Sequence, residues 1–238
     1  QYGGHYRRLN RDLSVAKDNK SFSPQLAPVS GYLIYLYLAT HDKNYLQQME
    51  KIMDLVLNKM THEDSPWVLE QFSRDWNYTY KPGPHGLELN TGHNAEVVWM
   101  LMRLHELTGN AGYKEEALSL AKPLFQHGLN DSTGIWYHRM DLQGPSNHSE
   151  SSPWWIQAYG NMLSMYLYHE TGENHYLKAF LKGAAFWNNH FIDKEYGGAF
   201  LSVNSDGSIL KGDKAVRTKT SYHSLEHTLL NYLYTNLW

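Results

Sequence analysis

The sequence predicts an all-α protein built from repeated helical hairpins, and three observations indicate this fold class. A short turn pattern occurs three times, apolar runs with helical spacing flank each copy, and a hairpin-like segment recurs between the helical pairs. Repeats of this length are typical of stacked helical hairpins, in which each unit buries its apolar face against the next unit. We therefore expect helical pairs that stack side by side.

The turn pattern comprises "ATHDKNYL", "LTGNAGYK" and "ETGENHYL", in which a Thr precedes a Tyr by five residues. The tyrosines are Tyr45, Tyr113 and Tyr176, so consecutive copies lie 68 and 63 residues apart. Gly or His-Asp in such a turn ends one helix and starts the next. The pattern therefore predicts a tight turn inside each helical pair.

The apolar runs on both sides of these turns have the spacing of helices, with residues recurring three or four positions apart. The predicted helices cover residues 29–39, 45–57, 95–107, 113–125, 154–169, 176–192 and 221–238. The first helix of each pair is apolar almost all round. We expect these first helices to be inner, buried helices, with the second helices outside them.

The segments between the helical pairs also repeat. "QYGGHYRRLNRDLS" (1–14) is similar to "EYGGAFLSVNSDGS" (195–208), and "GIWYHRMDLQG" (134–144) is a weaker copy. Alternating residues that end in an Asn or Asp turn are typical of short β-hairpins. The repeating unit is therefore helix, tight turn, helix and hairpin-bearing loop, with the long loops at one end of the helices.

An inner and an outer ring of helices would form a closed α/α toroid, and an open superhelix of hairpins is the alternative. The chain holds about three and a half hairpins, which is what a six-hairpin barrel would leave without its N-terminal helices. We therefore expect residues 1–238 to form a single domain, an incomplete (α/α)6 toroid. The chain starts at Gln1, so an earlier portion is expected, and the compartment, cytoplasmic or periplasmic, is not fixed.

Composition narrows the functional classes. The formal net charge is −3, which does not favour a nucleic-acid-binding face. The sequence contains no run of about 18 apolar residues, the length that would predict a membrane span. The absence of cysteine excludes disulfides, thiolate metal sites and Cys nucleophiles. The 18 Tyr, 8 Trp and 7 Phe suit either a carbohydrate pocket or a large aromatic core.

Two predicted inner helices begin with an ionisable pair. "TGHNAEVVWML" places His93 in the first turn with Glu96 three residues on, and "YHSLEH" does the same with His223 and Glu226. A helix N-terminus disfavours imidazolium and keeps a neutral base, and a Glu at i+3 shares its face. We expect both pairs to face one cavity at the loop end, or alternatively to serve only as helix-terminal hydrogen-bonding groups.

The order of "YGGHYRRLNRD", "GHNAEVVWML", "PWWIQA", "DKEYGGAF" and "YHSLEH" resembles the N-acylglucosamine 2-epimerase superfamily, which includes cellobiose 2-epimerases and mannose isomerase. The resemblance covers essentially the whole chain, as the C-terminal two-thirds of a typical member. It implies an (α/α)6 barrel and cofactor-free epimerisation or isomerisation of an unphosphorylated sugar. In that chemistry a base removes the proton beside an open-chain carbonyl, an enediolate forms, and reprotonation gives the 2-epimer or the ketose.

The resemblance assigns this proton transfer to His93 and His223, because imidazole can both accept and donate a proton near neutral pH. It places further residues around the sugar. Trp154 or Trp155 would stack on the sugar and Gln157 would bind its hydroxyls. Asp75 and Trp76 are candidates for the pocket rim, or alternatively belong to a loop anchored by its own aromatics, and Tyr159 completes the expected pocket.

The chain departs from the family pattern at three places. Tyr159 stands where many members have Glu, and Glu226 stands where Arg is common. The segment "SFSPQLAPVSGY" lacks the usual His and Glu, although it holds the polar Gln25 and Ser30. These departures keep both histidines but leave the sugar open. No basic cluster lies near the motifs, so a phosphorylated or acidic substrate is not favoured.

Three alternatives remain open at this point. The spacing of His223, Glu226 and His227 resembles an inverted zinc-protease motif, but the eleven residues that follow supply no further ligand, so no metal is expected. A glycoside hydrolase or lyase on an α/α toroid could use a carboxyl pair from Asp75, Glu96 and Glu226. A non-catalytic carbohydrate-binding scaffold is the third alternative. The oligomeric state is not fixed.

Overall fold

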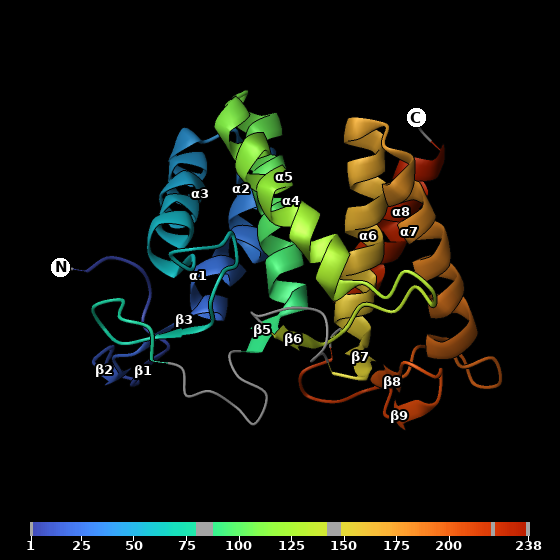
Figure 1. Cartoon of the computed structure of the whole chain (residues 1–238). Coiled ribbons are helices and arrows are strands. Elements are labelled where there is room, and N and C mark those ends of the chain that lie inside the picture. Colours follow the sequence, from blue (N-terminus) through green and yellow to red (C-terminus); the bar gives the residue numbers. More distant parts are fainter. Residues whose placement is uncertain (1, 80–87, 142–148, 220–221, 237–238) are drawn as a thin grey trace. The chain divides into compact units, whose positions relative to one another are not determined.

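The computed structural model describes residues 2–79, 88–141, 149–219 and 222–236, which are mostly helical (Figure 1). Two compact units make up the chain, Gln1–Ala121 and Lys122–Trp238. Among the described residues, none of the helices has the length and apolar character needed to cross a membrane.

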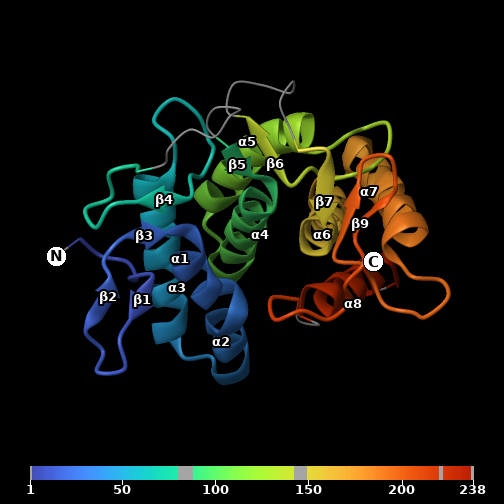
Figure 2. The same ribbon diagram turned by 90° about the horizontal axis from the view of Figure 1, so that it is seen from below.

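The first unit contains helices and short strands. Its helices are α1 (Phe22–Pro28), α2 (Ile34–Thr40), α3 (Lys43–Leu55) and α4 (Thr91–Thr108), with the π-helical turns η1 (Val29–Leu33) and η2 (Val56–Met60), and α5 (Ala111–Gly128) begins here. Its strands are β1 (Arg8–Leu9), β2 (Val15–Lys17), β3 (Lys20–Ser21), β4 (Gln71–Phe72) and β5 (Glu88–Asn90). The helices α1, η1 and α2 follow one another without a break, and α3 packs along them (Figures 1 and 2).

The second unit is centred on α6. Its elements are β6 (Arg139–Asp141), β7 (Ser151–Pro153), α6 (Trp154–Thr171), α7 (Asn174–Phe186), η3 (Trp187–Phe191), β8 (Ser202–Asn204), β9 (Ile209–Lys211) and α8 (Tyr222–Asn236). Helix α6 packs against both α7 and α8 (Figures 1 and 2). Strands β7, β8 and β9 form an antiparallel sheet, and because β7 runs directly into α6, this sheet fixes where α6 begins.

The three predicted tight turns are present and share one geometry. His41, Gly109 and Gly172 each end a helix in the left-handed conformation, with φ of 56°, 72° and 70°. Each donates its N–H to the carbonyl four residues back, which satisfies one of the last carbonyls of the helix. Glycine suits two of these positions because it has no side chain to clash when φ is positive.

The predicted hairpins at both ends of the chain are also confirmed, and they are copies in atomic detail. The turn Asn10–Ser14 is closed by a main-chain bond of 2.8 Å and Asn204–Ser208 by one of 2.9 Å. In each turn the Asn side chain donates to the Ser hydroxyl at 3.0 Å. The weaker copy contains β6, and its residues 142–144 lie outside the described part of the chain.

Burial separates the inner helices into two kinds. Helices α4 and α6 are buried almost all round, as their sequences predict. Helix α2 has the same apolar composition, yet Tyr35 is 46 % and Leu38 is 51 % exposed. Helix α8 likewise exposes Leu225 and Leu229. The prediction of a fully buried inner helix therefore holds for α4 and α6 but not for α2, because only one side of α2 is covered.

Candidate active site

His93 lies in the first turn of α4, as predicted, and its ring is held on two sides. Asn90 caps the helix by accepting the His93 N–H at 3.0 Å. The ring atom Nδ1 lies 2.7 Å from Oε1 of Glu70, and the ring stacks on Phe22 with centroids 4.3 Å apart. Both polar side chains remain partly accessible, at 19 % and 22 % exposure. An ionised Glu70 can only accept, so Nδ1 carries the proton and Nε2 holds the lone pair.

Glu96 lies one helical turn beyond His93 and has a different partner from the one predicted. The hydroxyl of Ser30 donates to Glu96 Oε1 at 2.7 Å, while the carboxylate at His93 Nδ1 belongs to Glu70. Glu96 is partly exposed, yet the surrounding protein removes much of its hydration, and this burial raises its pKa. The Ser30 hydrogen bond opposes that rise, as does His93 when its ring is protonated. Glu96 is therefore a carboxyl group that keeps its proton more readily than usual.

Glu70 was not predicted from the sequence. It lies in "SPWVLEQF", just before β4, and its main-chain carbonyl accepts the N–H of Phe22 at 3.0 Å. This segment occupies the hairpin position of its repeat, since Thr61 bridges Val68 as Leu129 bridges Trp136. The segment lacks the Tyr-Gly-Gly sequence found at residues 2–4 and 196–198, which is why the sequence repeat did not reveal it.

His223 lies in the first turn of α8 and is surrounded by aromatic rings. Its ring centroid lies 5.2 Å from that of Tyr159, 5.8 Å from Trp155 and 6.2 Å from Trp154. The Tyr159 hydroxyl donates to Oε2 of Glu226 at 3.4 Å. The structure therefore brings together five of the residues that the sequence predicted for the site, all within the second unit.

Lys219 adds a positive charge to this cluster that the sequence did not predict. Its ammonium group lies 5.6 Å from the centroid of the Trp154 ring, and it donates to the carbonyl of Ala199. Burial lowers the pKa of Lys219, and the nearby charge of Lys214 lowers it further. A cation over an indole face is favourable, so Lys219 helps to fix the position of Trp154.

Gln157 has a role different from the predicted contact with sugar hydroxyls. Its side chain is fully buried, it accepts the Trp136 N–H at 2.9 Å, and it donates to the Gly134 carbonyl at 2.9 Å. A side chain without exposed atoms cannot reach a ligand in solution. Gln157 therefore holds the loop before α6, and Gly134 suits that loop because a Cβ there would meet the main chain of Lys182 at 2.4 Å.

Asp75 and Trp76, predicted at the pocket rim, form a turn of their own. Asp75 is exposed, and hydrogen bonds from Ser73 and Asn77 lower its pKa. Trp76 is buried, and its indole N–H donates to the carbonyl of Tyr2 at 2.7 Å. Asp75 thus closes its own turn, and Trp76 anchors the N-terminal segment to this loop.

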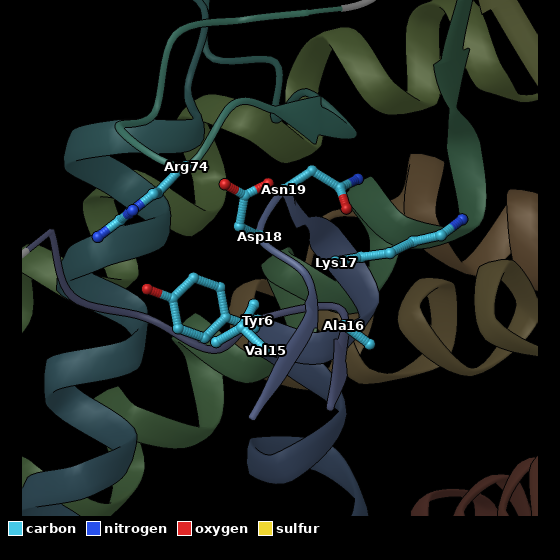
Figure 3. Close-up of a pocket in the computed structure, with 7 residues that line it drawn as sticks. All are labelled: Tyr6, Val15, Ala16, Lys17, Asp18, Asn19 and Arg74. Carbon is cyan, nitrogen blue, oxygen red and sulfur yellow. The ribbon is translucent and has the colours of Figure 1, made fainter. Parts of the chain in front are cut away.

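A cavity of about 490 Å³ opens on the first unit beside the β1–β2 hairpin (Figure 3). It is lined by Tyr6, Val15, Ala16, Lys17, Asp18, Asn19 and Arg74. None of the site residues predicted from the sequence lines this cavity. Its lining carries charges of both signs, and the ring of Tyr6 lies beside Val15 in this lining (Figure 3). The cavity is therefore separate from the residues that carry the predicted chemistry.

The zinc alternative can be compared with the structure. His227 is buried beside Trp187, with ring centroids 5.1 Å apart. In the part of the chain that the structure describes, no group of three or more His, Asp or Glu side chains is arranged to hold a metal ion.

Solved structures show the fold class of the chain. A cellobiose 2-epimerase from Spirochaeta thermophila matches with a TM-score of 0.86 at 21 % identity, over 100 % of this chain and 60 % of that one. A D-mannose isomerase matches with a TM-score of 0.84 at 18 % identity, over 96 % and 60 %. A family 76 glycoside hydrolase (mannosidase) from Bacteroides thetaiotaomicron matches with a TM-score of 0.68 at 12 % identity. The predicted fold class, an α/α toroid, is confirmed.

The sequence places the chain within that class. The model of the N-acylglucosamine 2-epimerase family matches residues 29–226, and the chain belongs to this family of sugar epimerases and isomerases. It is 25 % identical over 214 residues to cellobiose 2-epimerase of Bacteroides fragilis, covering 88 % of this chain and 52 % of the relative. It is 22 % identical over 201 residues to D-mannose isomerase of Marinomonas mediterranea, covering 81 % and 51 %. The chain thus spans about half the length of these curated relatives.

Proposed function

We propose that this chain catalyses proton transfer on an unphosphorylated aldose, or on the reducing end of a disaccharide, as a sugar 2-epimerase or aldose–ketose isomerase. Family membership supports the reaction class. The observation that carries the proposal is the contact of 2.7 Å between His93 Nδ1 and Glu70, on a ring that solvent can reach. Such a contact makes a neutral imidazole a base with a defined tautomer.

In the proposed first step, Nε2 of His93 accepts the proton from C2 of the open-chain aldose. The electrons of the C2–H bond form a C1–C2 double bond, and the negative charge moves to the carbonyl oxygen as an enediolate. Glu70 stabilises the imidazolium that results, because an ionised carboxylate lies 2.7 Å from its Nδ1. Phe22 restricts the ring by stacking on it.

We assign to Glu96 the role of a proton donor toward the enediolate oxygen. A general acid is most useful when its pKa lies near the working pH, and burial raises the pKa of Glu96 in that direction. Ser30 holds one oxygen of this carboxyl group and so limits its rotation. Glu96 would then act on the oxygen while His93 acts on the carbon.

The return of the proton is assigned to His223 on the family resemblance. Delivery to C2 from the other face, with the O1 proton returning to Glu96, gives the 2-epimer. Delivery to C1, with the O2 proton passing to Glu96, gives the ketose. Trp155 is partly exposed, and its ring, 5.8 Å from the His223 ring, offers an apolar face of the kind on which sugar C–H groups pack. Trp154 and Tyr159 are buried beside the same imidazole. The same aromatic cluster would therefore both bind sugar and place the second imidazole.

The test is deuterium exchange. The protein is incubated in deuterated water with cellobiose, D-mannose and an N-acylglucosamine, the sugars in the names of the relatives, and C2 is followed by NMR. We expect deuterium at C2, with the 2-epimer or the ketose as product, and loss of both with His93→Asn. A shorter sugar without exchange would instead indicate the hydrolase alternative, and sugar binding without either would indicate the scaffold.

A further inference from the structure

An amide side chain occupies the fourth residue of three helices, and each amide bonds the main chain of the preceding loop. The three residues are Gln25 in α1, Asn94 in α4 and Gln157 in α6, all at most 1 % exposed. Each has hydrogen bonds in both directions, accepting an N–H from the loop and donating to a loop carbonyl. Their loop partners are His5 for Gln25, Val68 for Asn94, and Trp136 with Gly134 for Gln157.

Both the oxygen and the nitrogen of the Asn94 amide form hydrogen bonds. Its Oδ1 accepts the N–H of Val68 at 2.9 Å, and its Nδ2 donates to the carbonyl of Val68 at 3.2 Å. The same Nδ2 also donates to the carbonyl of Asn90 at 3.0 Å, in the residue that caps α4. The first turn of α4 and the main chain of Val68 are thus held together as one rigid piece.

This piece carries both partners of the His93 contact. His93 precedes Asn94 on the helix, and Glu70 follows Val68 by two residues, so that Glu70 and Val68 share one side of an extended segment. The amides at the other two helices hold loops in the same way, but there the residue two positions on is Arg7 or His138. The amide contact is therefore common to the repeats, and only at α4 does it present a carboxylate to a histidine.

We propose that Asn94 is a positioning residue that sets the tautomer of His93 by holding Glu70 against Nδ1. This inference rests on the proposed function for its catalytic meaning, although the positioning itself does not require activity. Leucine is similar to asparagine in size but makes no hydrogen bonds, so Asn94→Leu would release both main-chain atoms of Val68. Asn94→Asp would keep the acceptor for the Val68 N–H and lose both donations.

The experiment measures the imidazole directly and the reaction separately. Side-chain nitrogen NMR of the full chain, with His93 assigned through His93→Asn, reports which ring nitrogen carries the proton. We expect the wild type to be protonated at Nδ1, and both Asn94 variants to give a mixture of tautomers with kcat for exchange lowered about tenfold or more. Gln157→Leu, which removes the equivalent amide in the second unit, should leave the His93 signal unchanged.

The outcomes are distinct. If the folded Asn94 variants keep the wild-type His93 tautomer, the proposal is overturned. It is equally overturned if both variants lose their helical circular dichroism, because Asn94 would then serve stability alone. If the wild type fails to exchange deuterium with any sugar but the tautomer still changes in the variants, the proposed function fails while the positioning role stands.

Discussion

The two units of the chain build a histidine site on the same plan. In each, a His-x-x-Glu pair opens a helix, and a hydroxyl from an earlier helix donates to the Glu: Ser30 to Glu96 in the first unit and Tyr159 to Glu226 in the second. In each unit, the helical segment that carries this hydroxyl begins with an aromatic residue, and the ring of that residue lies beside the histidine. These rings are Phe22, stacked on His93, and Trp154, edge-on to His223.

The units differ in what surrounds the imidazole. A carboxylate lies against His93, which fixes a proton on one ring nitrogen and supports a positive charge on the ring. Aromatic rings surround His223. One repeated scaffold thus places a carboxylate beside the histidine in one copy and aromatic rings in the other, depending on a few neighbouring side chains.

The largest expected effect comes from removing each histidine in turn. His93→Asn and His223→Asn should each lower deuterium exchange by about 10²–10⁴-fold, the range typical of a lost general base. If the two imidazoles act on opposite faces of C2, each variant should lose exchange mainly with one of the two epimers. NMR of both epimers in deuterated water measures this. Equal loss with both epimers in His93→Asn, and none in His223→Asn, would mean that only the first unit transfers protons.

The next test removes the carboxylate that distinguishes His93. Glu70→Gln keeps the size of the side chain but not its charge, so the imidazolium loses its stabilising partner. We expect kcat to fall about 10²-fold with KM little changed, since an orienting carboxylate beside a catalytic histidine can contribute up to about 10⁴-fold.

Glu226→Gln is the matched variant in the second unit, because a Gln oxygen can still accept the Tyr159 hydroxyl. It should have a smaller effect on kcat than Glu70→Gln. Equal losses in the two variants would show that the carboxylate contact is not what separates the two histidines.

The two units should differ in how the free energy of unfolding depends on pH. At the position four residues beyond the first histidine, α4 has Val97 and α8 has the buried His227. Burial lowers the pKa of His227 from 6.5 to about 4. The unfolded chain therefore takes up a proton below pH 6.5 that the folded chain refuses, and the free energy of unfolding falls as the pH drops from about 6.5 toward about 4.

The change should be roughly 2 kcal/mol between pH 7 and pH 5, at about 1.4 kcal/mol per pH unit below 6.5. Urea unfolding at the two pH values measures it. His227→Leu should remove most of this difference. An unchanged pH dependence in His227→Leu would place the titrating group elsewhere.

The sequence predicted the local features of this fold well. The tight turns at His41, Gly109 and Gly172 and the hairpin turns at Asn10 and Asn204 are determined by residues within a few positions of one another. Repetition then made the helical pairing visible, because equivalent positions carry equivalent turn residues. The same sequence motifs also predicted the family and the fold class.

Contacts between distant segments could not be predicted in this way. Glu70 reaches His93 across 23 residues, and Lys219 reaches Ala199 across 20. Gln157 was predicted to bind sugar because its motif lies beside two tryptophans, whereas its helical position turns it toward the loop main chain. Glu96 was predicted to orient His93 from spacing alone, and spacing does not tell that a Glu from another segment already occupies Nδ1.

The smallest expected effect concerns the two hydroxyls that bind the glutamates. The Ser30 hydrogen bond lowers the pKa of Glu96, so Ser30→Ala should raise that pKa further. If Glu96 acts as a proton donor, its protonated form would then persist to higher pH, and the alkaline fall of kcat/KM should move upward. The rate at neutral pH should change by less than about tenfold, since one hydrogen bond typically contributes about 1 kcal/mol.

Tyr159→Phe is the corresponding change in the second unit, and its hydrogen bond is longer, at 3.4 Å against 2.7 Å. Because hydrogen bonds weaken with distance, it should shift the pH profile less than Ser30→Ala does. The measurement is the pH profile of kcat/KM for both variants and for the wild type. A larger shift in Tyr159→Phe would mean that Glu226, and not Glu96, is the carboxyl group whose protonation limits the reaction, and the roles of the two units would have to be exchanged.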